Sequence, residues 1–247
     1  MNCAAATVDL LLTATQLTGR EAGHVVASPD WDCLLHPAAA AALMRMRAAA
    51  LAAGLEVQPI SGFRDFDRQR GIWNGKFRGE RPLLDRNGAA LDAQSLDAAQ
   101  RIEAILQWSA LPGASRHHWG SDLDVVEGGV VAGGYRPQLM PQEYRDGGPF
   151  APLNHWLQEH AADFGFFRPY DRDRGGVQPE PWHLSYAPIS VPACSDLRLE
   201  VLADALAGGD VDGWSELEPR LAELHWRFVQ NVASADGVVA SPASRIS

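Results

Sequence analysis

Hydrophobic and polar positions along the chain follow two periods, one typical of helices and one typical of strands. Helical spacing predicts a helix within residues 61–77, helices over 96–108 and 152–164, and two more within 195–232 that are interrupted at Gly208-Gly209. An alanine-rich run that begins at Pro37 and stops before Gly54 predicts a further helix over residues 37–53. Shorter alternating or apolar runs predict strands at residues 55–60, 123–126 and 182–186. The glycine- and proline-rich residues 130–148 predict a long irregular excursion.

These elements are mixed without the regular strand–helix–strand alternation of a parallel sheet. The sequence therefore predicts an α+β fold with a small antiparallel sheet flanked by helices. A chain of 247 residues is long enough for one sizeable domain with its own core. We expect residues 1–193 to form the main domain and residues 194–247 to form a helical extension packed on it.

Composition excludes several classes of function. The formal net charge of −10 argues against general nucleic-acid binding. No window holds about 18 consecutive apolar residues, so we expect no membrane insertion. Cys3, Cys33 and Cys194 are scattered, which argues against a disulfide framework and against a cysteine zinc site. Lys76 is the only lysine among 21 basic residues, which is typical of a coding bias toward arginine.

The strongest chemical signal is the segment SRHHWGSDLD, residues 115–124. A tight turn at Gly120 would fold His117 back onto the start of the next strand, so that an imidazole and a carboxylate face a common point. Asp122 and Asp124 lie two residues apart and therefore share one face of a strand. The local pattern does not choose between these two carboxylates.

A second cluster, EPWH at residues 180–183, places a carboxylate three residues before an imidazole. On a regular strand Glu180 and His183 would point to opposite faces, so a bend is needed to bring them together. Catalytic zinc takes three protein ligands and a water, and an unligated carboxylate nearby takes the proton of that water. Two histidines, one aspartate and one glutamate meet this requirement. The alternative is a solvated loop acid beside a strand histidine.

A third cluster, SGFR at residues 61–64, is followed by Gln69. An arginine just after a strand can direct its guanidinium at a substrate carboxylate or at a developing oxyanion. Taken alone, this arginine is better interpreted as the partner of Asp65 or Asp67 in a surface ion pair.

Together, the three clusters resemble the VanY-type D-alanyl-D-alanine carboxypeptidases, zinc peptidases of bacterial cell-wall metabolism. The resemblance rests on Ser-Gly-Phe-Arg with Gln five beyond the Arg, then Ser-x-His-x-x-Gly-x-x-x-Asp, then Glu-x-Trp-His, in that order across residues 57–188. It implies the hedgehog and D-Ala-D-Ala peptidase fold, with residues 1–193 as the zinc peptidase domain.

The resemblance also implies a set of site residues and Zn²⁺ as the cofactor. The set comprises the metal ligands His117, Asp124 and His183, the catalytic residues Glu180 (base) and Arg64, and the substrate-binding residues Gln69, Ser115 and Trp182. The implied reaction is hydrolysis of a peptide bond near the C-terminus of a peptidoglycan-type stem peptide that ends in D-Ala-D-Ala or a related D-amino acid.

Three alternatives stay open at this point. The first is a zinc endopeptidase that cuts within the stem peptide, and the second is a non-catalytic zinc-binding module. The third is a structural protein with scattered histidines. The sequence does not indicate an oligomeric state.

One departure from the family pattern is Asp122, which stands where a small apolar residue is usual. An acid there can accept from an imidazole N–H or from Arg116. His118 and Trp119 are also bulkier than the pattern requires. Together with the excursion at 130–148, they are expected to narrow the cleft and to affect the choice of substrate.

The first residues of the chain lack the features that are typical of a secretory signal peptide. No basic residue precedes Arg20, and Asp9 interrupts the apolar run. A cytoplasmic location is therefore favoured, with the periplasm as the alternative.

Overall fold

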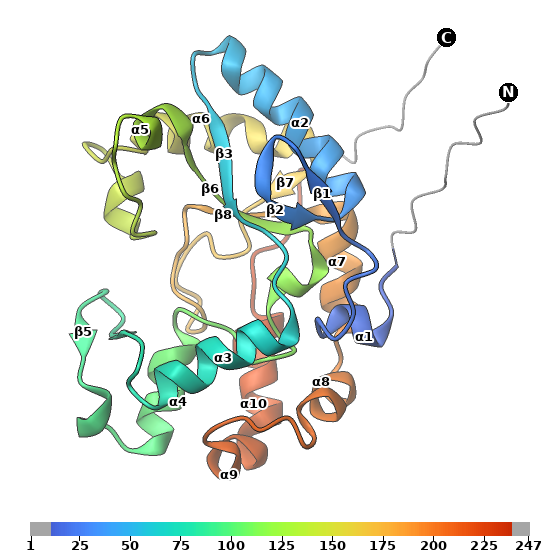
Figure 1. Ribbon diagram of the computed structural model, residues 1–247, viewed down its shortest axis with the longest axis vertical. Helices are drawn as coiled ribbons and strands as arrows, with labels where there is room; N and C mark the ends of the chain where they lie inside the picture. Colours follow the sequence, from blue (N-terminus) through green and yellow to red (C-terminus); the bar gives the residue numbers. More distant parts are fainter. Residues whose placement is uncertain (1–10, 239–247) are drawn as a thin grey trace, which may run out of the picture.

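The computed structural model describes residues 11–238 and has the predicted α+β architecture with small antiparallel sheets (Figure 1). The main sheet is antiparallel with the strand order β3-β6-β8-β7. Its strands are β3 (Val57–Ser61), β6 (Asp122–Glu127), β7 (Phe166–Phe167) and β8 (His183–Tyr186). Two hairpins accompany it, formed by β1 (Val26–Ser28) with β2 (Trp31–Leu35) and by β4 (Leu83–Leu84) with β5 (Ala90–Leu91).

Helices make up most of the remaining described chain. The α-helices are α1 (Ala14–Leu17), α2 (Pro37–Ala52), α3 (Phe66–Phe77), α4 (Ala98–Leu106), α5 (Gly128–Ala132), α6 (Ala151–His160), α7 (Ala187–Asp196), α8 (Leu199–Leu206), α9 (Trp214–Leu217) and α10 (Leu221–His225). Short 3-10 segments cover Ala93–Ser95, Arg116–Trp119, Pro141–Tyr144, Ala161–Phe164 and Glu218–Arg220, and a π-helical turn covers Trp226–Gln230.

Local capping explains where the longer helices begin. The side chain of Asp65 accepts from the backbone of the first turn of α3, and the side chain of Asp97 does the same for α4. Pro37 occupies the first turn of α2. A backbone N–H in this turn has no acceptor within the helix, so the N–H that proline lacks costs no hydrogen bond. These local signals account for the agreement between the predicted segments and helices α2, α3 and α4.

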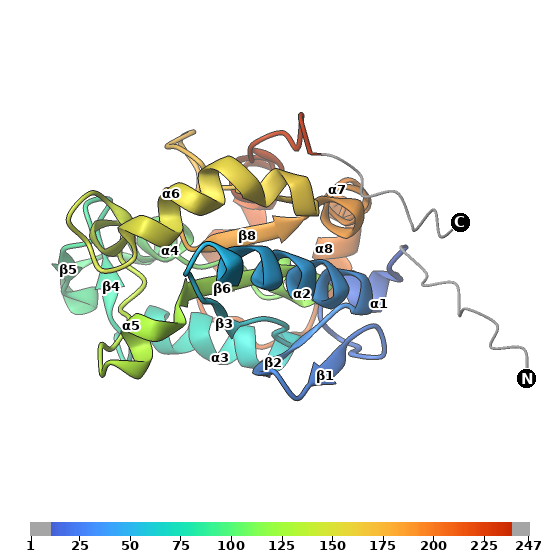
Figure 2. The same ribbon diagram turned by 90° about the horizontal axis from the view of Figure 1, so that it is seen from above.

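The main sheet has one apolar face and one polar face. Leu123 and Val125 of β6 point into a core shared with α2 and α6, which run along this face of the sheet (Figure 2). Side chains alternate along a strand, so Asp122 and Asp124 point to the opposite face. Both are buried there. The sheet thus directs its carboxylates away from its hydrophobic core.

A second core joins α3 and α4 to the C-terminal helices α8, α9 and α10. Trp73 of α3 is fully buried in it, and its indole N–H donates to the carbonyl of Asp212 at 3.0 Å. The tail therefore packs against the rest of the chain. The predicted boundary at residue 193 falls within α7, and the division into two parts stays a prediction.

The tail contains more helices than the two that the pattern predicts. A break does occur at Gly208-Gly209, where α8 has ended. A second interruption follows at Gly213, which has a φ of 78°, and Pro219 lies in the 3-10 turn between α9 and α10. Left-handed glycine and proline each interrupt helical hydrogen bonding, so the second predicted helix is divided.

None of the helices among residues 11–238 is long and apolar enough to span a bilayer. Cys33 and Cys194 are free cysteines. The predictions made for residues 1–10, including Cys3 and Asp9, lie outside the described residues, as does the end of the chain from 239 to 247.

Candidate metal centre and cavity

His117 reaches the sheet through the predicted turn at Gly120. It lies on the 3-10 turn Arg116–Trp119, which ends at Gly120 with a φ of 66°. A Cβ at this position would clash with Val25 and lie 2.9 Å from the backbone nitrogen of His36. The turn therefore requires glycine. It brings His117 Nε2 to 3.5 Å from Asp124 Oδ2.

Glu180 and His183 are brought together by the bend that the sequence required. The backbone N–H of His183 donates to the carbonyl of Glu180 at 3.1 Å, which closes a turn just before β8. As a result, Glu180 Oε2 lies 3.5 Å from His183 Nδ1. In the strand pairing, His183 lies directly opposite Asp124, and its Nδ1 is 3.2 Å from Asp124 Oδ1.

The side chains of His117, Asp124 and His183 offer three ligand atoms that lie within 4.8 Å of one another. All three residues are buried. Asp124 Oδ1 is a buried atom without a well-formed hydrogen bond. Two imidazole nitrogens and one carboxylate oxygen are the donors of many catalytic zinc sites, so these residues fit the ion.

Burial shifts the pKa values of His117 and Glu180, whereas at His183 the carboxylates of Asp122 and Asp124 outweigh burial and raise the pKa to about 10. Burial lowers the pKa of His117 to about 4, which keeps the imidazole neutral at pH 7, as a metal ligand must be. His117 Nδ1 lies 2.8 Å from the carbonyl of Gly62, so Nδ1 carries the hydrogen and Nε2 is free to bind a metal. Burial raises the pKa of Glu180 to about 7.

Arg64 approaches the site from the end of β3 and is anchored by Gln69. Its Nη1 donates to Gln69 Oε1 at 2.8 Å, and the Gln69 amide donates to the carbonyl of Ala110 at 2.7 Å. Gln69 is fully buried and does not line the cavity. The structure therefore places Gln69 behind Arg64, and a direct contact of Gln69 with substrate stays a prediction. The nearby Asp67 pairs with Arg70 instead of Arg64.

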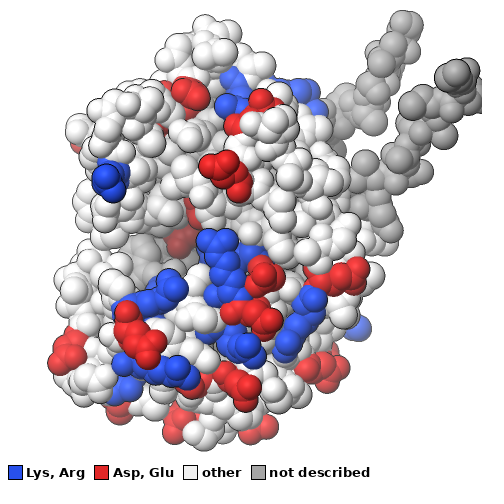
Figure 3. All heavy atoms as spheres, viewed as in Figure 1, with Lys and Arg blue, Asp and Glu red and all other residues white. Residues whose placement is uncertain are grey.

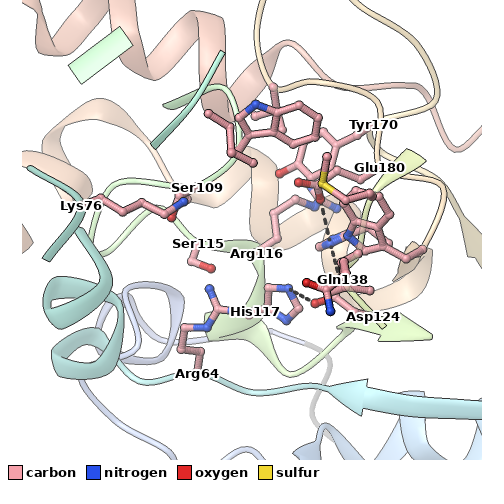
Figure 4. Close-up of a pocket in the computed structure, with 18 residues that line it drawn as sticks. Arg64, Lys76, Ser109, Ser115, Arg116, His117, Asp124, Gln138, Tyr170 and Glu180 are labelled. Carbon is pink, nitrogen blue, oxygen red and sulfur yellow. Dashed lines mark ion pairs between the residues drawn. The ribbon is translucent and has the colours of Figure 1, made fainter. Parts of the chain in front are cut away.

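A cavity of about 250 Å³ opens beside the three ligand atoms. In the space-filling view it lies in the hollow between the upper half of the molecule, with the main sheet, and the lower half, with α3 and α4 (Figure 3). Figure 4 shows Lys76, Ser115 and Arg64 on one side of it and Glu180 and Asp124 on the other. The cavity is thus cationic at one end and carries the metal donors at the other.

The wall of the cavity includes parts of the predicted excursion. Gln138, Leu139 and Met140 line it, as does Trp182. Trp182 packs on the ring of Tyr144, with ring centroids 5.8 Å apart. The excursion therefore shapes the cleft as expected.

His118 and Trp119 do not line the cavity. Both side chains are fully buried elsewhere. The indole of Trp119 donates to the carbonyl of Leu17 at 3.1 Å, and His118 Nε2 accepts from the backbone of Gly113 at 3.1 Å. The expectation that these two residues narrow the cleft is wrong, because their turn directs them into the core.

Lys76 is the main residue of the cavity that sequence reasoning missed. It projects from α3, and among residues 11–238 no carboxylate lies within ion-pair distance of it. Burial lowers the pKa of its ammonium group to about 8, so the group is still mostly charged at pH 7. The one sequence feature that could have drawn attention to Lys76 is that it is the only lysine of a chain whose other strongly basic residues are all arginine.

The chain is similar in sequence to several known proteins. A family model described as VanY, D-alanyl-D-alanine carboxypeptidase, matches residues 32–189. A Haemophilus influenzae protein described as uncharacterized is 44% identical over 103 residues, covering 40% of this chain and 70% of that protein. A D-alanyl-D-alanine carboxypeptidase of Enterococcus faecalis is 30% identical over 138 residues, covering 54% of this chain and 41% of that protein.

Among solved structures, VanYB in complex with D-Alanine-D-Alanine is 20% identical, with a TM-score of 0.49. The alignment covers 81% of this chain and 90% of that chain. The residues matched by the family model include all three sequence clusters.

Proposed function

The chain belongs to the VanY family of D-alanyl-D-alanine carboxypeptidases, a family of zinc peptidases, and we propose that it removes the terminal residue from peptidoglycan-type stem peptides that end in D-Ala-D-Ala. The observation that carries this proposal is the convergence of His117, Asp124 and His183 beside a cavity that also contains Glu180. Zn²⁺ is the proposed cofactor of these three ligands.

Glu180 is the proposed general base. Zinc held by His117, Asp124 and His183 would supply polarisation of the scissile carbonyl and a lowered pKa of the attacking water. Glu180 takes the proton of the attacking water and returns it to the leaving amine. Burial raises the pKa of Glu180 in the metal-free site, and a carboxyl group shifted in this direction returns a proton more readily than an exposed glutamate does.

Arg64 is proposed to stabilise negative charge on the substrate. Its Nη1 is engaged by Gln69, which orients the guanidinium at the cavity wall. A guanidinium held in this way can donate to the oxyanion that develops during hydrolysis, or to a carboxylate. Ser115 and Trp182 line the same cavity and are the proposed substrate contacts.

The cationic end of the cavity favours a carboxypeptidase over an endopeptidase. Arg64 and Lys76 both line the cavity, and Lys76 has no ion-pair partner among the described residues. The free C-terminal carboxylate of a substrate would supply a negative charge to pair with the two cations at this end of the cavity. An endopeptidase substrate would instead place a neutral, continuing peptide there.

A defined substrate tests the proposal directly. We expect the zinc-loaded protein to release one D-alanine from a stem peptide ending in D-Ala-D-Ala, seen by mass spectrometry as the loss of one residue. Internal fragments without free D-alanine would favour the endopeptidase. An intact peptide panel with zinc bound to the protein would favour the non-catalytic zinc module.

Replacing Lys76 tests how the substrate terminus is recognised. Lys76→Met should lower kcat/KM for a free-acid substrate by about 10- to 100-fold, the loss expected of one hydrogen bond to a charged group. The matching C-terminal amide should be cleaved almost as before, because it has no charge to lose. The measurement is kcat/KM for the acid and the amide with both proteins.

Two controls accompany this comparison. Arg68→Met removes an exposed cation of α3 that does not line the cavity, and it should leave both substrates unaffected. In the unchanged protein, the preference for the acid should weaken above a pH of about 8, where Lys76 loses its proton. Equal losses for acid and amide in Lys76→Met would contradict a role in carboxylate recognition.

A further inference from the structure

Asp122 is fully buried beside the candidate metal centre, yet it does not line the cavity. Its Oδ1 lies 3.0 Å from His183 Nε2 and accepts from Arg116 Nε at 2.7 Å. We propose that Asp122 and Arg116 form a buried positioning pair that fixes the tautomer and orientation of His183, so that Nδ1 faces the metal. This inference rests on the proposed function, because it assumes that His183 is a zinc ligand.

The two nitrogens of His183 face different carboxylates. Nε2 makes a well-formed hydrogen bond to Asp122, whereas Asp124 Oδ1, the oxygen that faces Nδ1, has no well-formed hydrogen bond, so in a neutral imidazole Nε2 carries the hydrogen. Nδ1 then keeps its lone pair, and it points toward Asp124 Oδ1 at 3.2 Å and Glu180 Oε2 at 3.5 Å. A carboxylate on the outer nitrogen of a ligand histidine holds the ring in place and makes the other nitrogen more basic.

Arg116 makes this arrangement possible in a buried place. An unpaired carboxylate with no exposed surface would be strongly destabilising. Arg116 is also buried, and it binds Asp122 through Nε while its Nη2 donates to Ser185 Oγ at 2.7 Å. Ser121 Oγ donates to the other oxygen of Asp122 at 2.7 Å. The carboxylate is therefore held from several sides and cannot turn away from His183.

Strand pairing builds this contact into the sheet. Asp122 of β6 is paired with Ser185 of β8, and Asp124 is paired with His183. The two carboxylates therefore lie next to each other along the same face, on either side of the His183 ring. One contacts the nitrogen on the metal side and the other contacts the opposite nitrogen.

Asp122 is not itself a candidate ligand or a catalytic residue. The group of converging ligand atoms includes Asp124 and not Asp122. Asp122 lies on the far side of the imidazole and does not reach the cavity, so it touches neither substrate nor metal. It acts through His183, and its removal should therefore change metal binding before any other property.

The test is the zinc affinity of the double variant Asp122→Ala/Arg116→Met. Removing both charges leaves neither one buried and unpaired, so the fold is disturbed less than by either single change. We expect the zinc Kd, measured by competition with a chelator, to rise by about 10- to 100-fold. The absorption spectrum of the cobalt-substituted protein should also change, because the ring of His183 is no longer held.

Ser190→Ala is the matched control. Ser190 is buried at the end of the same chain of hydrogen bonds, where it accepts from Ser185 Oγ at 2.6 Å, but it contacts neither Asp122 nor His183. The Ser190→Ala variant should have the same zinc Kd and the same cobalt spectrum as the unchanged protein. A change as large as in the double variant would overturn the inference, since any disturbance of the buried network would then suffice.

A folded double variant with an unchanged zinc Kd and cobalt spectrum would also overturn it. Should the double variant fail to fold, Asp122→Asn/Arg116→Gln decides, because both replacements are polar, keep much of the original shape and remove the two charges together. A weaker zinc affinity in this variant supports the positioning pair, and an unchanged affinity refutes it. Failure of the proposed function looks different, since the unchanged protein would then bind no zinc or cleave no peptide.

Discussion

Glu180→Gln is expected to lower kcat on a D-Ala-D-Ala-ended peptide by about 10²- to 10⁴-fold, the usual contribution of a general base. Zinc should stay bound, because Glu180 is not among the converging ligand atoms. Its carboxylate lies 3.5 Å from His183 Nδ1, close enough to act on a water at the metal. Glutamine keeps the size of the side chain and cannot accept the proton. Steady-state kinetics with metal analysis of the same sample measure both effects.

A second glutamate provides the control for this change. Glu127 ends β6 and caps the first turn of α5, and it does not line the cavity. Glu127→Gln should leave kcat almost unchanged. If Glu180→Gln hydrolysed the peptide at the normal rate, Glu180 would not be the base. If it lost its zinc as well, the loss of turnover would report on the metal instead of on proton transfer.

Removing the metal is expected to abolish hydrolysis, and added Zn²⁺ should restore it. Three buried donors converge, so a zinc ion that binds there should also stabilise the folded protein. Dialysis against a chelator, followed by titration with zinc, measures activity and melting temperature together. Both should rise in parallel as the site fills.

His117→Ala should fail to recover under the same titration, because the site then has only two of its three ligands. His155→Ala is the control, since His155 lies on α6 with its side chain 57% exposed, outside the cavity. It should recover fully. Activity that survives chelation would contradict the zinc mechanism, and equal behaviour of the two variants would contradict the assignment of His117.

Much of the fold could be predicted because its signals are local. Caps mark the starts of α2, α3 and α4, alanine content favours α2 and amphipathic periodicity marks α4, and the alternation at Leu123 and Val125 marks the buried strand β6. The tail was predicted less well, because the division after Gly208-Gly209 depends on Gly213 and Pro219 within a region that is amphipathic throughout.

The residues of the candidate site, like the elements of the fold, could be predicted only in part from the sequence. His117 and Glu180 could be singled out because each precedes a strand by a short turn, and the chemistry of zinc requires both residue types. For Gln69 the motif gives the position in the chain but not the direction of the amide, and only the structure shows this amide between Arg64 and the carbonyl of Ala110. Lys76 was overlooked because nothing in the sequence around α3 indicates that this part of the helix faces the metal donors.

The sequence by itself determined the family, the fold class and the types of residue at the site. The family resemblance preferred Asp124 to Asp122 by motif register alone, and only the tertiary structure shows where each of the two carboxylates lies. The two carboxylates share a strand face, so periodicity cannot separate them. The pairing of β6 with β8 can, because it places Asp124 opposite His183 on the cavity side and leaves Asp122 behind the same ring with Arg116. Register between strands is a long-range property, and no local pattern contains it.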